Sequence, residues 1–244
     1  MTEPFSPLPV LRLKPKADAR AIRHGHPWAW ADDLVLDRRA RAIPAGALAV
    51  LEDAERQPLG LGVATLEAKI GLRLLDRNRD AVIDGAWLTA RIEAAVRLRA
   101  RLYAQPFYRL IHAEGDGLPG LIVDRFGDTL VMQPNAIWLE EREDAVAAAL
   151  LAVTGCGTLI KNATSRARLA EGLPEMMAAL AGSAPDAPIP VPMNGAIYMA
   201  DVMGGQKTGL FYDQRDNHAF AARLARGARV LDVFSHVGGF ALAA

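Results

Sequence analysis

A proline-rich stretch near residue 190 constrains this chain more than any other feature. Residues 182–192 read Gly-Ser-Ala-Pro-Asp-Ala-Pro-Ile-Pro-Val-Pro, and each proline fixes φ and removes a backbone hydrogen-bond donor. A helix or a central strand therefore cannot run through this stretch. We expect an extended connector over residues 182–193 that divides the chain into separate parts.

The part before the connector begins with short strands. Residues 10–14 alternate apolar and polar side chains, and further apolar runs lie at 47–51, 59–63 and 70–75, with turn residues between them. Period-two alternation over short runs is typical of half-buried strands. Residues 9–80 are therefore predicted to form a small β-barrel or sandwich.

The next part mixes helices and strands. Apolar residues recur at helical spacing from Leu88 to Leu102, three strand-like runs follow between residues 107 and 133, and an alanine-rich helix is expected over residues 138–153. A strand at 158–162 and a helical stretch at 165–173 come next. We expect residues 84–181 to form an α+β domain.

Residues 194–244 carry the strongest functional pattern. We expect a strand at 197–202, a glycine-rich loop at 204–209, a helix capped by Asp213, a buried strand at 229–234, and then a glycine turn and a helix start. Strand, glycine turn and helix is the opening unit of a doubly wound α/β sheet. Because such strands are covered on both faces, we expect residues 229–244 to pack poorly, to be borrowed by a partner molecule or to be prone to aggregation. We also expect the domain to be cut short after Ala244.

Two glycine-bearing loops are candidate ligand sites. Residues 204–208, Gly-Gly-Gln-Lys-Thr, do not form a P-loop, because Gln206 stands where that motif needs glycine. Residues 234–240 do not match the dinucleotide fingerprint either, yet Gly238 and Gly239 follow a buried strand and let a ligand approach the backbone. On the residues alone, an ordinary turn and a cofactor site both remain open.

Longer motifs around these loops resemble a known family. Residues 205–215 (Gly-Gln-Lys-Thr-Gly-Leu-Phe-Tyr-Asp-Gln-Arg) and 230–240 (Val-Leu-Asp-Val-Phe-Ser-His-Val-Gly-Gly-Phe) are similar to class I S-adenosylmethionine-dependent ribosomal-RNA methyltransferases of the large-subunit cytosine-5 type, the RlmI (YccW) family. Residues 115–128 resemble its middle domain, and residues 24–30 the start of its N-terminal PUA domain. The resemblance implies an α+β multidomain protein with an N-terminal PUA-like β-barrel, an α+β middle domain and the start of a Rossmann-like α/β methyltransferase domain.

The resemblance also implies site residues for S-adenosyl-L-methionine, the expected cofactor. The first group surrounds the glutamine-lysine-threonine-glycine segment: Lys207, Thr208, Phe211, Asp213, Gln214 and Arg215. The second surrounds the last glycine loop: Asp232, Phe234, Ser235, Gly238, Gly239 and Phe240. Purely structural roles stay open for three of these residues. Asp213 could serve simply as a helix cap, Phe211 as a core residue, and Arg215 as the ion-pair partner of Asp216 or Asp232.

The family's cysteine nucleophile, which adds to carbon 6 of the pyrimidine, is expected beyond Ala244. The only cysteine here, Cys156, is expected to be a small buried residue. We therefore expect no catalytic residue in this chain and no methyl transfer by it alone. A lone cysteine and the absence of metal-ligand spacing predict a reduced, cytoplasmic protein without a metal site, and the longest apolar run is too short to cross a membrane.

Ribosomal RNA is the expected partner, and a homodimer is left open. The 28 basic and 28 acidic residues balance, so RNA contacts must come from local clustering, and the predicted RNA-binding residues are Arg12, Lys14, Lys16, Arg20 and Arg23. Trp28 is expected in the core rather than stacked on a base. Three hypotheses follow: part of an RNA methyltransferase, a non-catalytic RNA-binding module with relic cofactor motifs, or a methyltransferase of this fold acting on another base or on protein.

Overall fold

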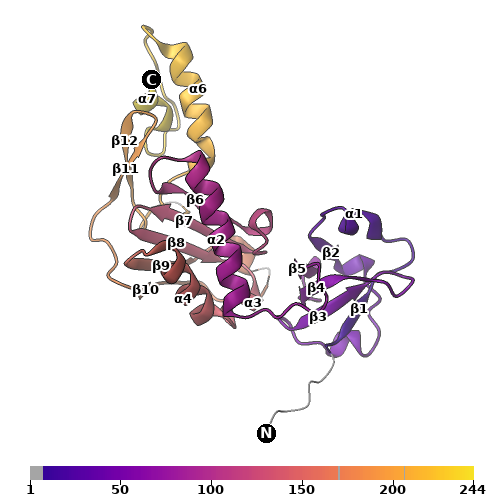
Figure 1. The fold of residues 1–244 in the computed structure, drawn as a ribbon. Helices are drawn as coiled ribbons and strands as arrows, with labels where there is room; N and C mark the ends of the chain where they lie inside the picture. Colours follow the sequence, from indigo (N-terminus) through magenta and orange to yellow (C-terminus); the bar gives the residue numbers. More distant parts are fainter. Residues whose placement is uncertain (1–7, 170, 206) are drawn as a thin grey trace.

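The computed structural model describes residues 8–169, 171–205 and 207–244. Three parts follow one another along the chain: an N-terminal domain (residues 8–77), a middle domain (84–181) and a C-terminal unit (189–244). The N-terminal domain and the C-terminal unit lie at opposite ends of the middle domain (Figure 1).

The N-terminal domain is built on a five-stranded sheet in the order β1-β3-β4-β5-β2. Its strands are β1 (Val10–Arg12), β2 (Trp28–Trp30), β3 (Leu48–Glu52), β4 (Pro58–Ala64) and β5 (Ile70–Asp76), and the short helix α1 (Ala19–Arg23) lies between β1 and β2. β1 runs parallel to β3 and the other pairs are antiparallel. Apolar residues at alternate strand positions, including Leu11, Leu51 and Leu72, form the core. The edge strand β2 was not expected from the sequence.

The middle domain contains a second five-stranded sheet, in the order β10-β9-β8-β7-β6. Its strands are β6 (Phe107–His112), β7 (Leu121–Phe126), β8 (Thr129–Pro134), β9 (Thr158–Ala163) and β10 (Met176–Ala181). β8 and β9 are parallel, because a helical crossover joins them, and the other pairs are antiparallel.

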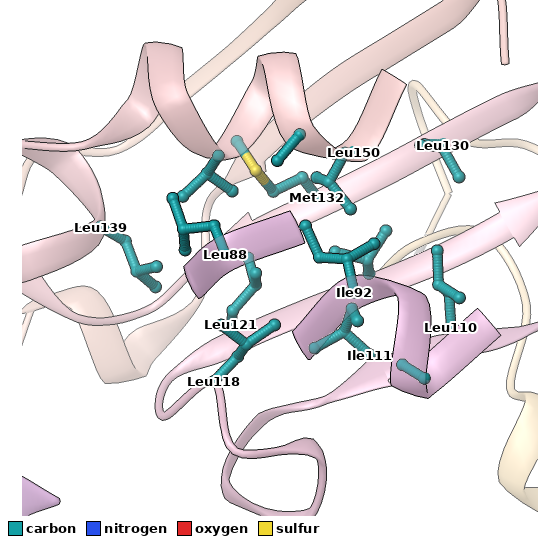
Figure 2. Close-up of a cluster of buried hydrophobic side chains, with 14 of the residues drawn as sticks. Leu88, Ile92, Leu110, Ile111, Leu118, Leu121, Leu130, Met132, Leu139 and Leu150 are labelled. Atoms are coloured by element: carbon teal, nitrogen blue, oxygen red, sulfur yellow. The ribbon is translucent and has the colours of Figure 1, made fainter. Parts of the chain in front are cut away.

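Two helices cover one face of this sheet. Asp84 caps α2 (Gly85–Leu102), and its carboxylate accepts a hydrogen bond from the Trp87 amide (2.9 Å). Gly155, in the left-handed conformation, is the C-cap of α4 (Glu143–Thr154). Figure 2 shows Leu88 and Ile92 from α2 and Leu150 from α4 meeting strand residues in one apolar cluster. This cluster is the largest core of the molecule among the described residues.

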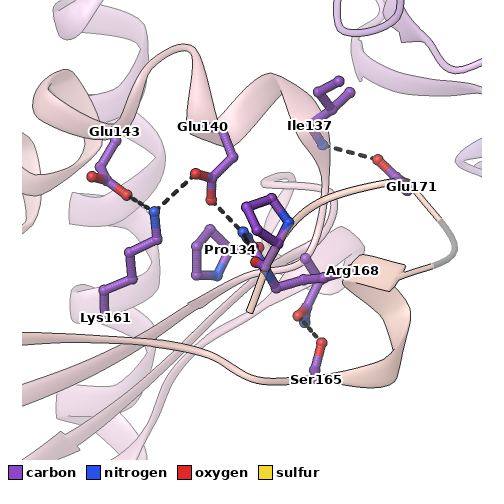
Figure 3. Close-up of polar contacts among 10 residues, drawn as sticks. Pro134, Ile137, Glu140, Glu143, Lys161, Ser165, Arg168 and Glu171 are labelled. Carbon is purple, nitrogen blue, oxygen red and sulfur yellow. Dashed lines mark hydrogen bonds and ion pairs between the residues drawn. The ribbon is translucent and has the colours of Figure 1, made fainter. Parts of the chain in front are cut away.

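The expected helix over residues 138–153 is interrupted. α3 (Ile137–Glu140) ends before α4 starts, because Arg142 leaves the helical backbone with φ near −121°. The break lets Trp138 enter the core while Glu140 turns toward the sheet, where it meets Lys161 of β9 and Arg168 of α5 (Arg166–Leu169) (Figure 3).

This cluster of buried charges is fully paired. Lys161 Nζ lies 2.9 Å from a Glu140 oxygen and also contacts Glu143, while Arg168 donates to Glu140 (2.6 Å) and to the carbonyls of Pro134 and Pro174. Burial raises the pKa of Glu140, but hydrogen bonds from its two cationic partners outweigh it and leave the pKa below its ordinary value. Each charge has its counter-charge, so we assign the cluster a structural role.

The C-terminal unit covers the opposite face of the middle sheet. Strand residues that alternate with those of the first core, including Phe126, Val131 and Ile160, pack against Val191 and Tyr198 of the hairpin formed by β11 (Ile189–Met193) and β12 (Ala196–Ala200). Because both faces of the sheet are covered, β8 is buried along its whole length.

The connector expected over residues 182–193 is therefore wrong in its last part, since residues 189–193 form a strand. Pro190 pairs with Met199 and Pro192 with Ile197 across the hairpin. In an antiparallel pair every second residue directs its backbone groups away from its neighbour. Prolines at alternate positions consequently leave the hydrogen bonds of the hairpin intact.

Two further expectations in this unit are wrong. The helix α6 (Arg215–Ala225) follows a short 3-10 turn at Tyr212–Gln214, and its N-cap is Gln214, so Asp213 does not cap it. Residues 229–234 form no strand: Val230, Leu231, Val233 and Phe234 are exposed, as expected for a poorly packed segment, and without neighbouring strands their backbone groups find no ladder partners. A short helix, α7 (Gly239–Ala243), follows.

The N-terminal and middle domains are joined by polar contacts. Trp28 Nε1 donates to Glu114 (2.8 Å), and an Arg73 nitrogen lies 2.5 Å from a Glu171 oxygen. Among the described residues, none of the helices combines the length and apolarity needed to cross a bilayer.

Candidate functional site

The loop that precedes α6 is anchored by a buried polar centre. Thr208 and Asp124 are both fully buried, and the Thr208 hydroxyl donates to Asp124 Oδ2 (2.6 Å). Arg109 donates to both oxygens of the same carboxylate (2.9 and 3.0 Å). A buried carboxylate needs such partners, so this centre fixes the loop to β6 and β7.

Three more hydrogen bonds hold the same segment to the middle sheet. Asn162 Nδ2 donates to the Lys207 carbonyl (2.6 Å), and the Tyr212 hydroxyl donates to the Arg125 carbonyl (2.9 Å). Arg215 donates to the Phe107 carbonyl (2.5 Å), with its guanidinium 4.6 Å from the centre of the Tyr103 ring. Burial raises the pKa of the Tyr212 phenol far above its ordinary value, so this group remains a proton donor.

With the loop anchored, a cavity of about 250 Å³ opens between it, α6 and the last glycine loop. Apolar and aromatic side chains alternate with a few polar groups around it, as in small-molecule sites. Its lining residues are Leu210, Phe211, Gln214, His218, Asp232, Val233, Phe234, Ser235, His236, Val237, Gly239 and Phe240.

The glycine loop on the far wall is organised by Asp232. One of its carboxylate oxygens accepts hydrogen bonds from the Ser235 hydroxyl (3.0 Å) and from the Ala241 amide (3.2 Å). The Ser235 oxygen in turn accepts from the Gly238 amide (3.1 Å). Gly238 adopts a left-handed φ of 75°, which glycine tolerates without a Cβ clash. Asp232 thus ties the loop to the start of α7.

His218 lines the cavity and was missed in the sequence. It is 6 % exposed, stacks on Tyr198 and meets the Phe240 ring edge-on at 4.6 Å between ring centres. Burial lowers the pKa of His218, although Asp232 and Asp213 favour its charged form. The only sequence signal was its position four residues after Gln214, the N-cap of α6, a spacing that brings two side chains to the same side of a helix.

The structure divides the expected cofactor residues into two groups. One group lines the cavity: Phe211, Gln214, Asp232, Phe234, Ser235, Gly239 and Phe240. The other does not: Lys207, Thr208, Asp213, Arg215 and Gly238. Within the second group, Thr208 anchors the loop and Arg215 faces Tyr103 on the other side of α6, pairing with neither Asp216 nor Asp232 among the described contacts. Lys207 Nζ lies 4.7 Å from the centre of the Phe211 ring.

The expected RNA-binding residues differ in their surroundings. Arg12 pairs with Glu52 (3.5 Å), Arg23 pairs with Asp53, and Lys14 Nζ donates to the Asp32 carbonyl (2.7 Å). Lys16 and Arg20 are exposed and form no ion pair in the described part of the chain. These last two side chains are the ones most available to phosphates.

Two remaining residues can be placed directly. Cys156 is buried, as expected, and donates weakly to the Gly127 carbonyl (3.7 Å between sulfur and oxygen). Trp28 is half-buried rather than in the core, because β2 is an edge strand and its indole is held by Glu114. Among the described residues, no group of three or more His, Cys, Asp or Glu side chains is arranged to hold a metal ion.

Comparison with known proteins gives a consistent result. Residues 11–77 match the family described as PUA-like domain. The chain is 33 % identical over 236 residues to Ribosomal RNA large subunit methyltransferase I of Shewanella denitrificans and 35 % identical over 257 residues to Ribosomal RNA large subunit methyltransferase of Deinococcus radiodurans. These alignments include 95 % and 99 % of this chain but 59 % and 61 % of the relatives, so the chain spans about three fifths of their length.

Solved structures show the same fold. A Streptococcus mutans protein provisionally assigned as a SAM-dependent methyltransferase matches with a TM-score of 0.73 at 16 % identity, over 88 % of this chain and 54 % of that one. A second methyltransferase structure, also provisionally assigned and solved with SAH bound, matches with a TM-score of 0.73 at 17 % identity over the same shares. The expected fold class, with an N-terminal PUA-like domain followed by α/β parts, is confirmed.

Proposed function

We propose that this chain forms the RNA-binding part, and one wall of the cofactor site, of an S-adenosylmethionine-dependent RNA methyltransferase. Over nearly all of its own length the chain is homologous to the large-subunit ribosomal RNA methyltransferases. The observation that carries the proposal is the cavity between Phe211 and the Asp232–Phe240 loop. The two segments are separated in sequence by α6, yet they enclose one space.

The residues around this cavity fit an adenosyl cofactor. Phe211 and Phe240 offer aromatic surfaces for a flat ring, and Gly239 leaves room beside the backbone. His218 Nδ1 is buried and has no hydrogen-bond partner among the described residues, so a bound ligand would satisfy it. At about 250 Å³ the cavity is smaller than the ~300–1,000 Å³ usual for ligand sites, and we propose that these residues contact only part of the cofactor.

The cofactor would supply the methyl group, while the residues of this chain bind and orient it. Phe211, Gln214 and Phe240 would position the adenosyl part, and Asp232 would keep the glycine loop in place through Ser235. The base is proposed to be cytosine of large-subunit ribosomal RNA, methylated at carbon 5, in the cytoplasm. Because that chemistry needs a thiolate at the base and Cys156 is buried outside the cavity, we expect the 244-residue chain to bind without transferring a methyl group.

Calorimetric titration with S-adenosylhomocysteine tests the cofactor proposal. We expect saturable binding that Phe211→Ala weakens by about tenfold, since removing a stacked aromatic ring costs about 1–3 kcal/mol. Phe220→Ala is the matched control, because Phe220 also lies on the C-terminal unit but is exposed and does not line the cavity. Equal affinities for the two variants, or no binding at all, would refute the assignment of this cavity.

A further inference from the structure

The N-terminal domain contains a second hollow, of about 190 Å³, beside the edge strand β2. One wall comes from α1 and the residues before it, including Asp18 and Ile22, and the other from His26, Trp28, Trp30 and Asp33. Trp28 and Trp30 share one face of the strand, because side chains alternate along it, while Ala29 between them is buried in the core. The hollow is several times the ~30 Å³ that a water molecule occupies in the liquid.

Three aromatic rings are grouped at this hollow. The Trp28 and Trp30 ring centres lie 5.5 Å apart with an interplanar angle of 69°, and the His26 ring lies 5.8 Å from Trp28 and 6.2 Å from Trp30. Since the two indoles meet edge to face, a flat ligand would stack on the outer face of one ring rather than slide between them. Both indoles are only half-buried, and an accessible aromatic ring can stack an unpaired base.

The platform is held in place from the middle domain. Trp28 Nε1 donates to Glu114 (2.8 Å), which also lies 3.9 Å from an Arg73 nitrogen. Both indoles are therefore oriented before a ligand arrives: Trp28 by this bond, and Trp30 by its contact with Trp28. A ring that is already oriented loses little freedom on binding.

The acidic residues of the hollow restrict what it can hold. Asp18 uses one oxygen to cap α1 through the Ala21 amide (2.8 Å), and the Asp33 carboxylate accepts no hydrogen bond within the described chain. Two carboxylates repel a phosphate and accept hydrogen bonds from an amine. The exposed cations Lys16 and Arg20 lie on the neighbouring surface of residues 14–23, where they suit a phosphate backbone.

We propose that this hollow binds one unpaired base that carries an exocyclic amine (adenine, cytosine or guanine, but not uracil) from a single-stranded RNA segment. The base stacks on an indole of the pair formed by Trp28 and Trp30, its exocyclic amine donates to Asp33, and the flanking phosphates lie along Lys16 and Arg20. This inference rests on the proposed RNA-binding function, and it adds where the N-terminal domain reads a base and which bases it prefers. Glu114 acts as a positioning residue.

The test measures binding of RNA strands of about eight nucleotides to the full chain. Oligo(A), oligo(C), oligo(U) and an RNA duplex are compared, with tryptophan fluorescence as a second readout. We expect oligo(A) and oligo(C) to quench the fluorescence and to bind more tightly than oligo(U) and duplex. Trp30→Ala should weaken oligo(A) and oligo(C) by about tenfold, in line with the loss of one base–aromatic stack, and should leave duplex binding unchanged.

Further variants separate the contributions. Asp33→Asn should reduce the preference for oligo(C) over oligo(U) without loss of folding, and Trp30→Phe, which keeps a ring, should retain most of the binding. Replacing Lys16 and Arg20 together by glutamine should weaken every RNA and lower the salt dependence of single-strand binding by about 1.4 logarithmic units per decade of salt. Trp87→Phe, outside the hollow, is the matched control for fluorescence.

Each outcome decides a specific claim. If neither Trp30→Ala nor Asp33→Asn changes the affinity for RNA, the proposed base pocket is overturned, while RNA binding by the basic surface remains supported. Adenosine or cytidine alone binding as tightly as the oligonucleotides would assign the hollow to a free nucleoside instead. No binding of any RNA at low salt would overturn both this inference and the proposed RNA partner, whereas cofactor titration would still report on the other cavity.

Discussion

The buried Thr208–Asp124 hydrogen bond offers the sharpest test of how the C-terminal unit is held. Thr208→Val replaces the hydroxyl by a methyl group of similar size, so Asp124 loses one donor but keeps both hydrogen bonds from Arg109. A hydrogen bond to a charged group contributes about 1.5–3 kcal/mol. Because the carboxylate is not left wholly unpaired, the 3–5 kcal/mol cost of breaking a buried pair does not apply. We expect a loss of about 2 kcal/mol.

The loss should appear as easier separation of the C-terminal unit from the middle sheet. Where amides exchange through this opening, 2 kcal/mol corresponds to about 30-fold faster hydrogen exchange, measured by mass spectrometry over β11, β12 and α6. Thr208→Ser keeps the hydroxyl and removes one buried methyl group, at a cost of about 0.8 kcal/mol. Thr89→Val, on α2, where the hydroxyl makes no hydrogen bond among the described residues, should change little.

Protection of these segments from hydrogen exchange is therefore expected to decrease from wild type to Thr208→Ser and again to Thr208→Val. Exchange in Thr208→Val within about threefold of wild type, a difference of under 1 kcal/mol, would refute the idea that this bond holds the unit. Faster exchange in the serine variant than in the valine variant would show that the methyl group, rather than the hydroxyl, anchors the loop.

Two predictions concern pH. Hydrogen bonds from its cationic partners outweigh burial and lower the pKa of Glu140. The charged Glu140 side chain therefore stabilises the fold above its unfolded pKa, near 4.5, and this contribution is lost as pH falls through its folded pKa. Glu140→Gln should flatten the decrease in urea-unfolding free energy between about pH 5 and pH 3, while Glu93→Gln, at an exposed site, should not. Burial lowers the pKa of His218, so protection of α7 from hydrogen exchange should be full above about pH 6.5 and fall below it; an unchanged slope in His218→Phe would contradict this.

Much of the middle domain could be predicted from the sequence, because its strands repeat apolar residues at the sheet period and its helices at the helical period. β10 was missed, since Met176–Ala181 lacks β-branched residues and is defined only by pairing with β9. The strand expected at residues 229–234 has the right composition, but a strand needs neighbours to satisfy its backbone, and none of the described residues provides them.

The candidate site was predictable as two segments rather than as a set of side chains. Thr208, Phe211 and Arg215 belong to one continuous motif, yet Thr208 points into the middle sheet, Phe211 into the cavity and Arg215 toward Tyr103. An irregular loop has no period from which such directions follow. The directions of Trp28 and Trp30 could have been predicted once β2 was recognised, because side chains two residues apart along a strand lie on the same face.

The prolines of β11 have one more consequence. Pro190 and Pro192 direct their backbone away from β12, so the outer margin of the hairpin presents carbonyls at these positions without amide hydrogens. A strand from another molecule that tried to extend this ribbon would find acceptors but lack donors there, which is how natural sheets guard against unwanted growth. At these positions the β11 margin of the hairpin is thus protected against pairing with a further strand.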